Sequence, residues 1–322
     1  KAYSWLTSSI RIGFSGNNRI DLIMWLISAF ASALFLGLYD VNKKLGLRNN
    51  AVLPVLFLNT VLCSLFFLPI LLLSRFAPDT LKDTIFFVSS VPASTHGFIL
   101  LKSVIVLISW GTAYVAIKNL PITLVGPIKA LQPSVVLLGA LLVFKEQLNL
   151  YQWLGVLVAL ACFVLYSMAG KKEGVSFWTN KWVWFLFVAV ITGAISGLYD
   201  KYLMNHYDRM AVQVWYTIYQ IGLMLPVLLI FWYPKRKVEA PFEFRWSIIG
   251  IAFFLSLSDF LYFYALSLPD SMISVVSVVR RSGIVISFLA GAFFFHEKNI
   301  RIKGLILLGV LAAMFLLYLG SR

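Results

Sequence analysis

The sequence predicts an all-α integral membrane protein with ten transmembrane helices in two inverted five-helix repeats. Hydrophobic residues make up 61% of the 322-residue chain, charged residues only 12%, and the mean hydropathy is +0.89. A soluble domain is about half apolar and roughly a quarter charged. The apolar residues form runs long enough to cross a hydrocarbon core of roughly 30 Å. The motif Gly-Leu-Tyr-Asp also occurs twice, at 37–40 and 197–200, which indicates an internal duplication.

Ten segments fit a membrane crossing at about 1.5 Å per helical residue. The spans are expected at 21–39, 52–73, 98–117, 121–143, 150–169, 181–199, 211–233, 246–266, 270–294 and 302–320. The longest link within either half, 74–97, is expected to hold a short interfacial helix. Cys63 and Cys162 lie inside apolar runs, so they predict core residues and neither a disulfide nor a metal site.

Further features recur in the same order along the chain. Leu68-Pro69 is repeated as Leu225-Pro226, Pro121 as Pro269, and Phe-Lys-Glu at 144–146 as Phe-His-Glu at 295–297. The halves are therefore 21–170 and 181–321, and 1–20 is an N-terminal segment that is either peripheral or foreign to the native chain. Because each half has an odd number of spans, the second half is expected to insert upside down. Inverted repeats are typical of secondary transporters, whose sites lie near the bilayer midplane between the halves.

Three basic residues lie deep inside predicted spans. Lys129 is roughly 12 Å into span 4, and Arg280 and Arg281 are roughly 15–17 Å into span 9. Each costs about 2.5–3.5 kcal/mol at the bilayer centre on insertion scales. We interpret them as an anion site. The alternative is that Asp259 neutralises one arginine while the others reach water, with Asp270 at a span start as a second possible partner.

The two halves carry a family resemblance. The segments 120–170 and 268–320, with Pro133 in the middle of span 4 and Glu146 in the turn after it, resemble the EamA-type repeats of the drug/metabolite transporter superfamily. The second half lacks the mid-span proline and has Arg281-Ser282-Gly283 in that region. The resemblance covers about residues 20–321, and it implies a ten-helix carrier fold with alternating access.

A closer resemblance concerns two short segments, Ile-Lys-Ala-Leu-Gln-Pro at 128–133 and Ser-Val-Val-Ser-Val-Val-Arg-Arg at 274–281. They are similar to the substrate-site segments of the triose-phosphate/phosphate translocators. This resemblance implies that Lys129, Arg280 and Arg281 hold phosphate. The chain departs from that branch, since the first arginine replaces a lysine and span 3 lacks its histidine. The remaining candidate substrate contacts by position are Trp110, Thr112 and Tyr114 in span 3 and Tyr262 or Tyr264 in span 8.

The aspartates of the duplicated motif, Asp40 and Asp200, are expected at the ends of spans 1 and 6, on opposite membrane faces. One interpretation is an interfacial cap in which Asp40 pairs with Lys43 or Lys44 at helical spacing. The functional interpretation is a pair of gates, one on each side, in which a carboxylate meets a basic residue; these acids and Asp259 are also candidates for proton coupling. Lys102, in span 3, is expected to extend its ammonium to the interface.

These observations predict a secondary transporter that carries or exchanges a phosphorylated or otherwise anionic metabolite. The alternatives are a proton-coupled exporter of amino acids or other metabolites and a flippase for a phosphate-bearing lipid. An intramembrane aspartyl protease needs two aspartates in one site, so we expect no enzyme. Neither a cofactor nor nucleic-acid binding is expected, and His96, His206 and His296 lack metal-ligand spacing. The predicted state is a monomer or weak dimer in a bacterial inner membrane.

Overall fold

The computed structural model describes residues 16–129, 131–136, 149–171, 179–236, 241–268, 271, 273–295 and 299–320. The regular structure of these residues is helical throughout. The α-helices are α1 (Gly16–Leu47), α2 (Val52–Phe76), α3 (Ala93–Asn119), α4 (Ile122–Lys129), α6 (Leu150–Lys171), α7 (Lys181–His206), α8 (Arg209–Val227), α9 (Trp246–Ser267), α10 (Ile273–Arg281), α11 (Ile284–Phe293) and α12 (Ile300–Gly320). Short helical turns are η1 (Pro78–Thr80), η2 (Leu228–Trp232) and η3 (Tyr233–Lys235).

Eight helices in the described ranges are long and apolar enough to cross a membrane. An integral membrane protein is therefore supported, whereas the number ten stays a prediction because span 121–143 falls partly outside the described residues. Residues 1–15 of the N-terminal segment, Glu146, Asp270 and the 295–297 motif beyond its first residue also lie outside them. The link at 74–97 holds only the three-residue turn η1.

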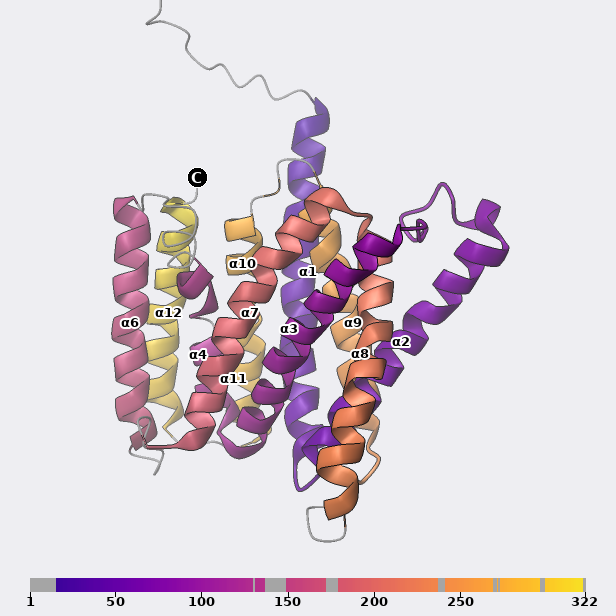
Figure 1. Cartoon of the computed structure of the whole chain (residues 1–322). Helices are drawn as coiled ribbons and strands as arrows, with labels where there is room; N and C mark the ends of the chain where they lie inside the picture. The colour runs from indigo at the N-terminus through magenta and orange to yellow at the C-terminus, as the bar shows by residue number, and fades with distance from the viewer. Residues whose placement is uncertain are drawn as a thin grey trace, which may run out of the picture.

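The helices stand side by side in one bundle (Figure 1). The pair α6–α12 lies at one edge, α2 and α8 lie at the other, and α3 and α7 pack against each other between them. The first residues of α1 and the C-terminus lie at the same end of the bundle. Side-chain hydrogen bonds join α1 to α9, since Ser32 Oγ donates to the Ser258 carbonyl at 2.8 Å and Ser258 Oγ to that of Ser32 at 2.9 Å. Small hydroxyl residues are typical of close contacts between membrane helices.

Two spans that the sequence predicts as continuous are interrupted near their middle. In the first half, α4 ends at Lys129 and a separate helix begins at 132. Pro133 lacks the N–H that would bond the Lys129 carbonyl, and its ring crowds that carbonyl, so the helix cannot continue. In the second half, α10 ends at Arg281 and α11 begins at Ile284. Both interruptions directly follow the basic residues singled out above.

The second interruption is packed against α1 without intervening side chains. A Cβ atom added at Gly283 would lie 3.2 Å from the Gly37 backbone nitrogen and would also collide with the Ala33 carbonyl. A Cβ added at Gly37 would lie 2.6 Å from the Gly283 carbonyl oxygen. Only glycine permits this approach, which fixes Arg280 and Arg281 beside α1. Gly37, the first residue of the duplicated motif, therefore has a packing role.

Candidate functional site

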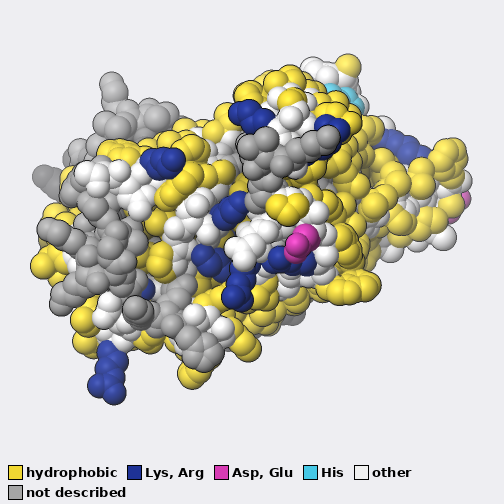
Figure 2. All heavy atoms as spheres, turned by 90° about the horizontal axis from the view of Figure 1, so that it is seen from below, with side chains coloured by type: hydrophobic (Ala, Val, Ile, Leu, Met, Phe, Trp, Pro, Cys, Tyr) yellow, Lys and Arg dark blue, Asp and Glu magenta, His cyan; other side chains and the backbone are white. Residues whose placement is uncertain are grey.

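A cavity of about 120 Å³ lies between α1, α3, α4, α7, α9 and α10. A smaller one of about 20 Å³ adjoins it at the two helix interruptions, where its lining includes Asp40, Lys129, Arg281 and Gly283. Seen from below, the protein has Lys and Arg side chains near the centre of this face and mostly hydrophobic side chains at its edges (Figure 2). The charged residues lining the larger cavity are Lys43, Lys102, Lys129, Asp200, Asp259, Arg280 and Arg281.

The three cations of the predicted anion site come together in the structure. Lys129 is the last residue of α4, and Arg280 and Arg281 are the last residues of α10. All three line both cavities. The interruptions explain this placement, because each helix ends beside the cavity with its basic residues in the final turn.

Two of these cations already have carboxylate partners. Lys129 Nζ lies 3.0 Å and 2.9 Å from the two oxygens of Asp40. Arg280 forms an ion pair with Asp259, so the alternative in which this aspartate neutralises one arginine describes part of the site correctly. Arg280 Nε is buried without a partner. Arg281 forms no ion pair or hydrogen bond within the described part of the chain, so it is open to a ligand.

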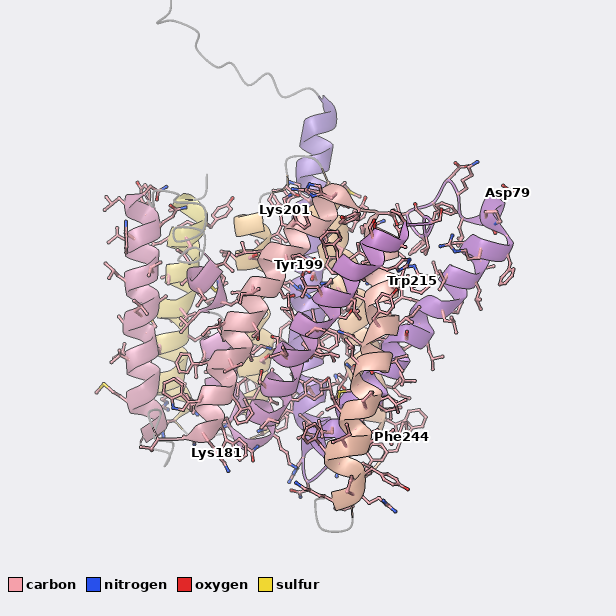
Figure 3. All side chains as sticks on the ribbon, viewed as in Figure 1. Asp79, Lys181, Tyr199, Lys201, Trp215 and Phe244 are labelled. Carbon is pink, nitrogen blue, oxygen red and sulfur yellow. The ribbon has the colours of Figure 1, made fainter. Side chains whose placement is uncertain are left out.

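The positions of Asp40 and Asp200 differ from the prediction that they end their spans. α1 continues to Leu47 and α7 to His206, and both aspartates are buried. They therefore lie inside the bundle and not at the ends of their helices. In Figure 3, α7 rises from Lys181 at the lower end to Lys201 near the upper end. The polar residues that follow each motif suggested a helix end, but in α1 a lysine among them is buried.

That lysine is Lys43, whose side chain is only 1% exposed. Its Nζ lies 2.8 Å from Asp40 Oδ1, 3.9 Å from the centre of the Tyr39 ring and 5.1 Å from that of Tyr114. The pairing of Asp40 with Lys43 was one of the two alternatives, and it exists together with the Lys129 pair. Tyr114 is fully buried beside Lys43 and is not part of the cavity lining.

Lys102 does not extend to the membrane surface, contrary to the prediction. It is 2% exposed and forms an ion pair with Asp200, which joins α3 to α7. The rings of Tyr216 and Phe263 each lie 4.8 Å from its Nζ. A partner in the other half of the chain offsets the cost of burying the charge, and sequence spacing cannot reveal such a partner.

Aromatic candidates divide between the cavity and its surroundings. Trp110 and Tyr262 line the cavity, and the Tyr262 ring centre lies 4.0 Å from Arg280 Cζ, in a cation–π contact. Tyr264 instead lies against Arg209, 4.9 Å from its Cζ. Of the two span 8 tyrosines, the one at the site is therefore Tyr262. The same helix supplies Asp259, whose Oδ2 accepts a 2.8 Å hydrogen bond from Tyr216 Oη.

Sequence reasoning missed the serine and glutamine residues at the cavity, which are Ser109, Gln132, Ser196 and Ser277. Gln132 lies directly after the α4 interruption, and Ser277 is one helical turn before Arg281. Gln132 and Ser277 each lie within four residues of a deep cation along the chain, and this proximity could have identified them. Over the described residues, the two cavities are lined by five basic side chains and three carboxylates, which leaves a net charge of +2.

Residues 23–168 match the model of the EamA-like transporter family, so this part of the chain is similar to that family. A search of the curated proteins gave no match. Among 26 matching chains of solved structures, one described as "Crystal structure of protein" has a TM-score of 0.57 at 15% identity, with 91% of this chain and 97% of that chain covered. At this identity the likeness concerns the fold alone. The narrower similarity to triose-phosphate/phosphate translocators is not confirmed by these comparisons and stays a prediction.

Proposed function

We propose that this protein carries or exchanges a small phosphorylated or otherwise anionic organic metabolite by alternating access. The observation that carries the proposal is Arg281, a cation without a protein partner among the described residues. It lines two adjoining cavities whose combined net charge is +2. An arginine presents a planar fork that can donate two parallel hydrogen bonds to phosphate or carboxylate, and a nearby lysine adds a point charge. A dianion would leave the occupied site neutral.

The size of the cavity favours a small substrate. Its volume of about 120 Å³ is roughly ten times the minimum of about 10–15 Å³ that one water molecule needs. A compact organic anion suits this volume better than a phospholipid head group, which counts against the flippase alternative. A proton-coupled exporter of amino acids remains the second candidate, and the buried carboxylates Asp200 and Asp259 favour it.

The proposal includes two halves of inverted topology. Its supports are the interior prolines Pro69 in α2 and Pro226 in α8, the interruptions after Lys129 and Arg281, and the opposite directions of α1 and α7 in Figure 1. Discontinuous helices that end at the site are a common device of such carriers. The proposed setting is the bacterial inner membrane, as a monomer or weak dimer.

The charge of the empty cavity favours exchange over one-way transport. If three unpaired cations lined it, closing around an empty site would be strongly unfavourable, but Asp40 and Asp259 already neutralise two of them. The remaining excess of two positive charges in a low-dielectric cavity still opposes closure. We therefore expect a preference for exchange together with a slow movement of the empty carrier.

Thermal-shift titration of the purified protein tests this proposal. Inorganic phosphate and small organophosphates should stabilise the folded state by about 2.7 kcal/mol at one hundred times Kd. Arg281→Ala should abolish this response, and Arg48→Ala, which removes an exposed arginine, should retain it. If neutral amino acids stabilise the wild type instead, and Arg281→Ala still responds to them, the exporter alternative is correct. Counterflow into liposomes preloaded with the stabilising compound then measures transport.

A further inference from the structure

We propose that Asp40 binds Lys129 when no substrate is present, and that the anionic group of the substrate displaces it. Lys43 is then the positioning residue that keeps Asp40 paired after this displacement. The inference rests on the proposed function, because it assigns a competitor to the same anion site. It explains why two lysines converge on one carboxylate, although one would neutralise it.

The geometry gives the carboxylate two separate partners. Lys129 Nζ approaches both oxygens of Asp40, at 3.0 Å and 2.9 Å, and Lys43 Nζ lies 2.8 Å from Oδ1. A phosphate presents a similar pair of acceptor oxygens to an ammonium group. Lys129 lines both cavities, whereas Asp40 lines only the smaller one. A substrate in the larger cavity would therefore meet Lys129 but not Asp40.

Lys43 determines what displacement costs. Removing one partner of a buried ion pair typically costs about 3–5 kcal/mol, because a charge is left uncompensated. Lys43 is fixed on the same helix, three residues from Asp40, between the rings of Tyr39 and Tyr114. It stays with Asp40 wherever α1 moves. Asp40 thus gives up Lys129 without becoming an unpaired charge.

The arginine side of the site lacks an equivalent second cation. Asp259 is shared between Arg280 and the neutral hydroxyl of Tyr216, so displacing it from Arg280 costs more. We therefore assign the exchangeable contact to Lys129. Because the Asp40–Lys129 pair joins α1 to α4, substrate at Lys129 also releases that contact between helices.

A double-mutant cycle tests the inference, with inorganic phosphate as the probe and calorimetric titration of the purified full chain as the measurement. Asp40→Asn removes the competitor, so the affinity for phosphate should rise by about tenfold, which corresponds to roughly 1.4 kcal/mol. Lys43→Met should lower it by about tenfold or more, since the displaced Asp40 would then be unpaired. The double variant D40N/K43M keeps the net charge of the site and should bind more tightly than the wild type.

A purely structural role for Asp40 and Lys43 predicts a different pattern, in which both single variants and the double variant lose affinity. That result overturns the inference, as does wild-type affinity in Lys43→Met. If Asp40→Asn fails to fold, the comparison of D40N/K43M with the wild type still decides, because tighter binding supports the inference and weaker binding refutes it. If phosphate binds the wild type without a gain in Asp40→Asn, only this inference is wrong. If phosphate binds neither, the proposed function is wrong as well.

Discussion

The ion pair between Lys102 and Asp200 gives the sharpest test of how this bundle holds its buried charges. The two side chains are 2% and 8% exposed, and the pair joins α3 to α7. Exposed ion pairs contribute about 0–1 kcal/mol, whereas loss of one partner of a buried pair costs about 3–5 kcal/mol. Asp200→Asn should therefore destabilise the protein by about 3–5 kcal/mol. At about 2 °C per kcal/mol, suitable for a long chain, Tm should fall by about 6–10 °C.

The double variant K102M/D200N separates the ion pair from general packing. Replacement of both charges removes the uncompensated lysine, and methionine fits the aromatic contacts that Tyr216 and Phe263 make with Lys102. Its Tm should return to within about 2 °C of the wild type. Thermal unfolding in detergent, followed by intrinsic fluorescence, measures all the variants. A fall of less than about 2 °C in Asp200→Asn would mean that water reaches the pair and that the buried network is wrongly assigned.

Further variants test the site and its gates. Gly283→Ala should cost about 1–3 kcal/mol, because its Cβ meets the α1 backbone, whereas Gly111→Ala, with no atom within 4 Å of the added Cβ, should have little effect on Tm. Asp40→Asn and Asp200→Asn should shift cysteine accessibility toward opposite membrane faces, and unchanged labelling in both would leave these acids with a purely structural role. Arg281→Lys should bind phosphate weakly, because the charge remains but the planar fork is lost. Calorimetric titration of the variant and the wild type measures this, and equal affinities would contradict the prediction.

The predicted membrane class and the location of the site followed from local features of the chain. Most of the predicted spans correspond to helices whose bounds differ by a few residues, because apolar length is a local property. The deep cations Lys129, Arg280 and Arg281 were recognisable because a charge inside an apolar run needs an explanation. Asp259, a possible partner for one arginine, was visible for the same reason.

The sequence by itself determined a helical membrane protein, the duplicated order of its motifs and the cations of its site. Only the tertiary structure decided which charges are neutralised. Lys43 was expected in a cap at the membrane interface and Lys102 was expected to reach that interface, yet both are buried against aspartates. The reason is physical: the cost of burying a charge depends on a partner within a few ångströms, and for Lys102 and Lys129 that partner lies 98 and 89 residues away along the chain.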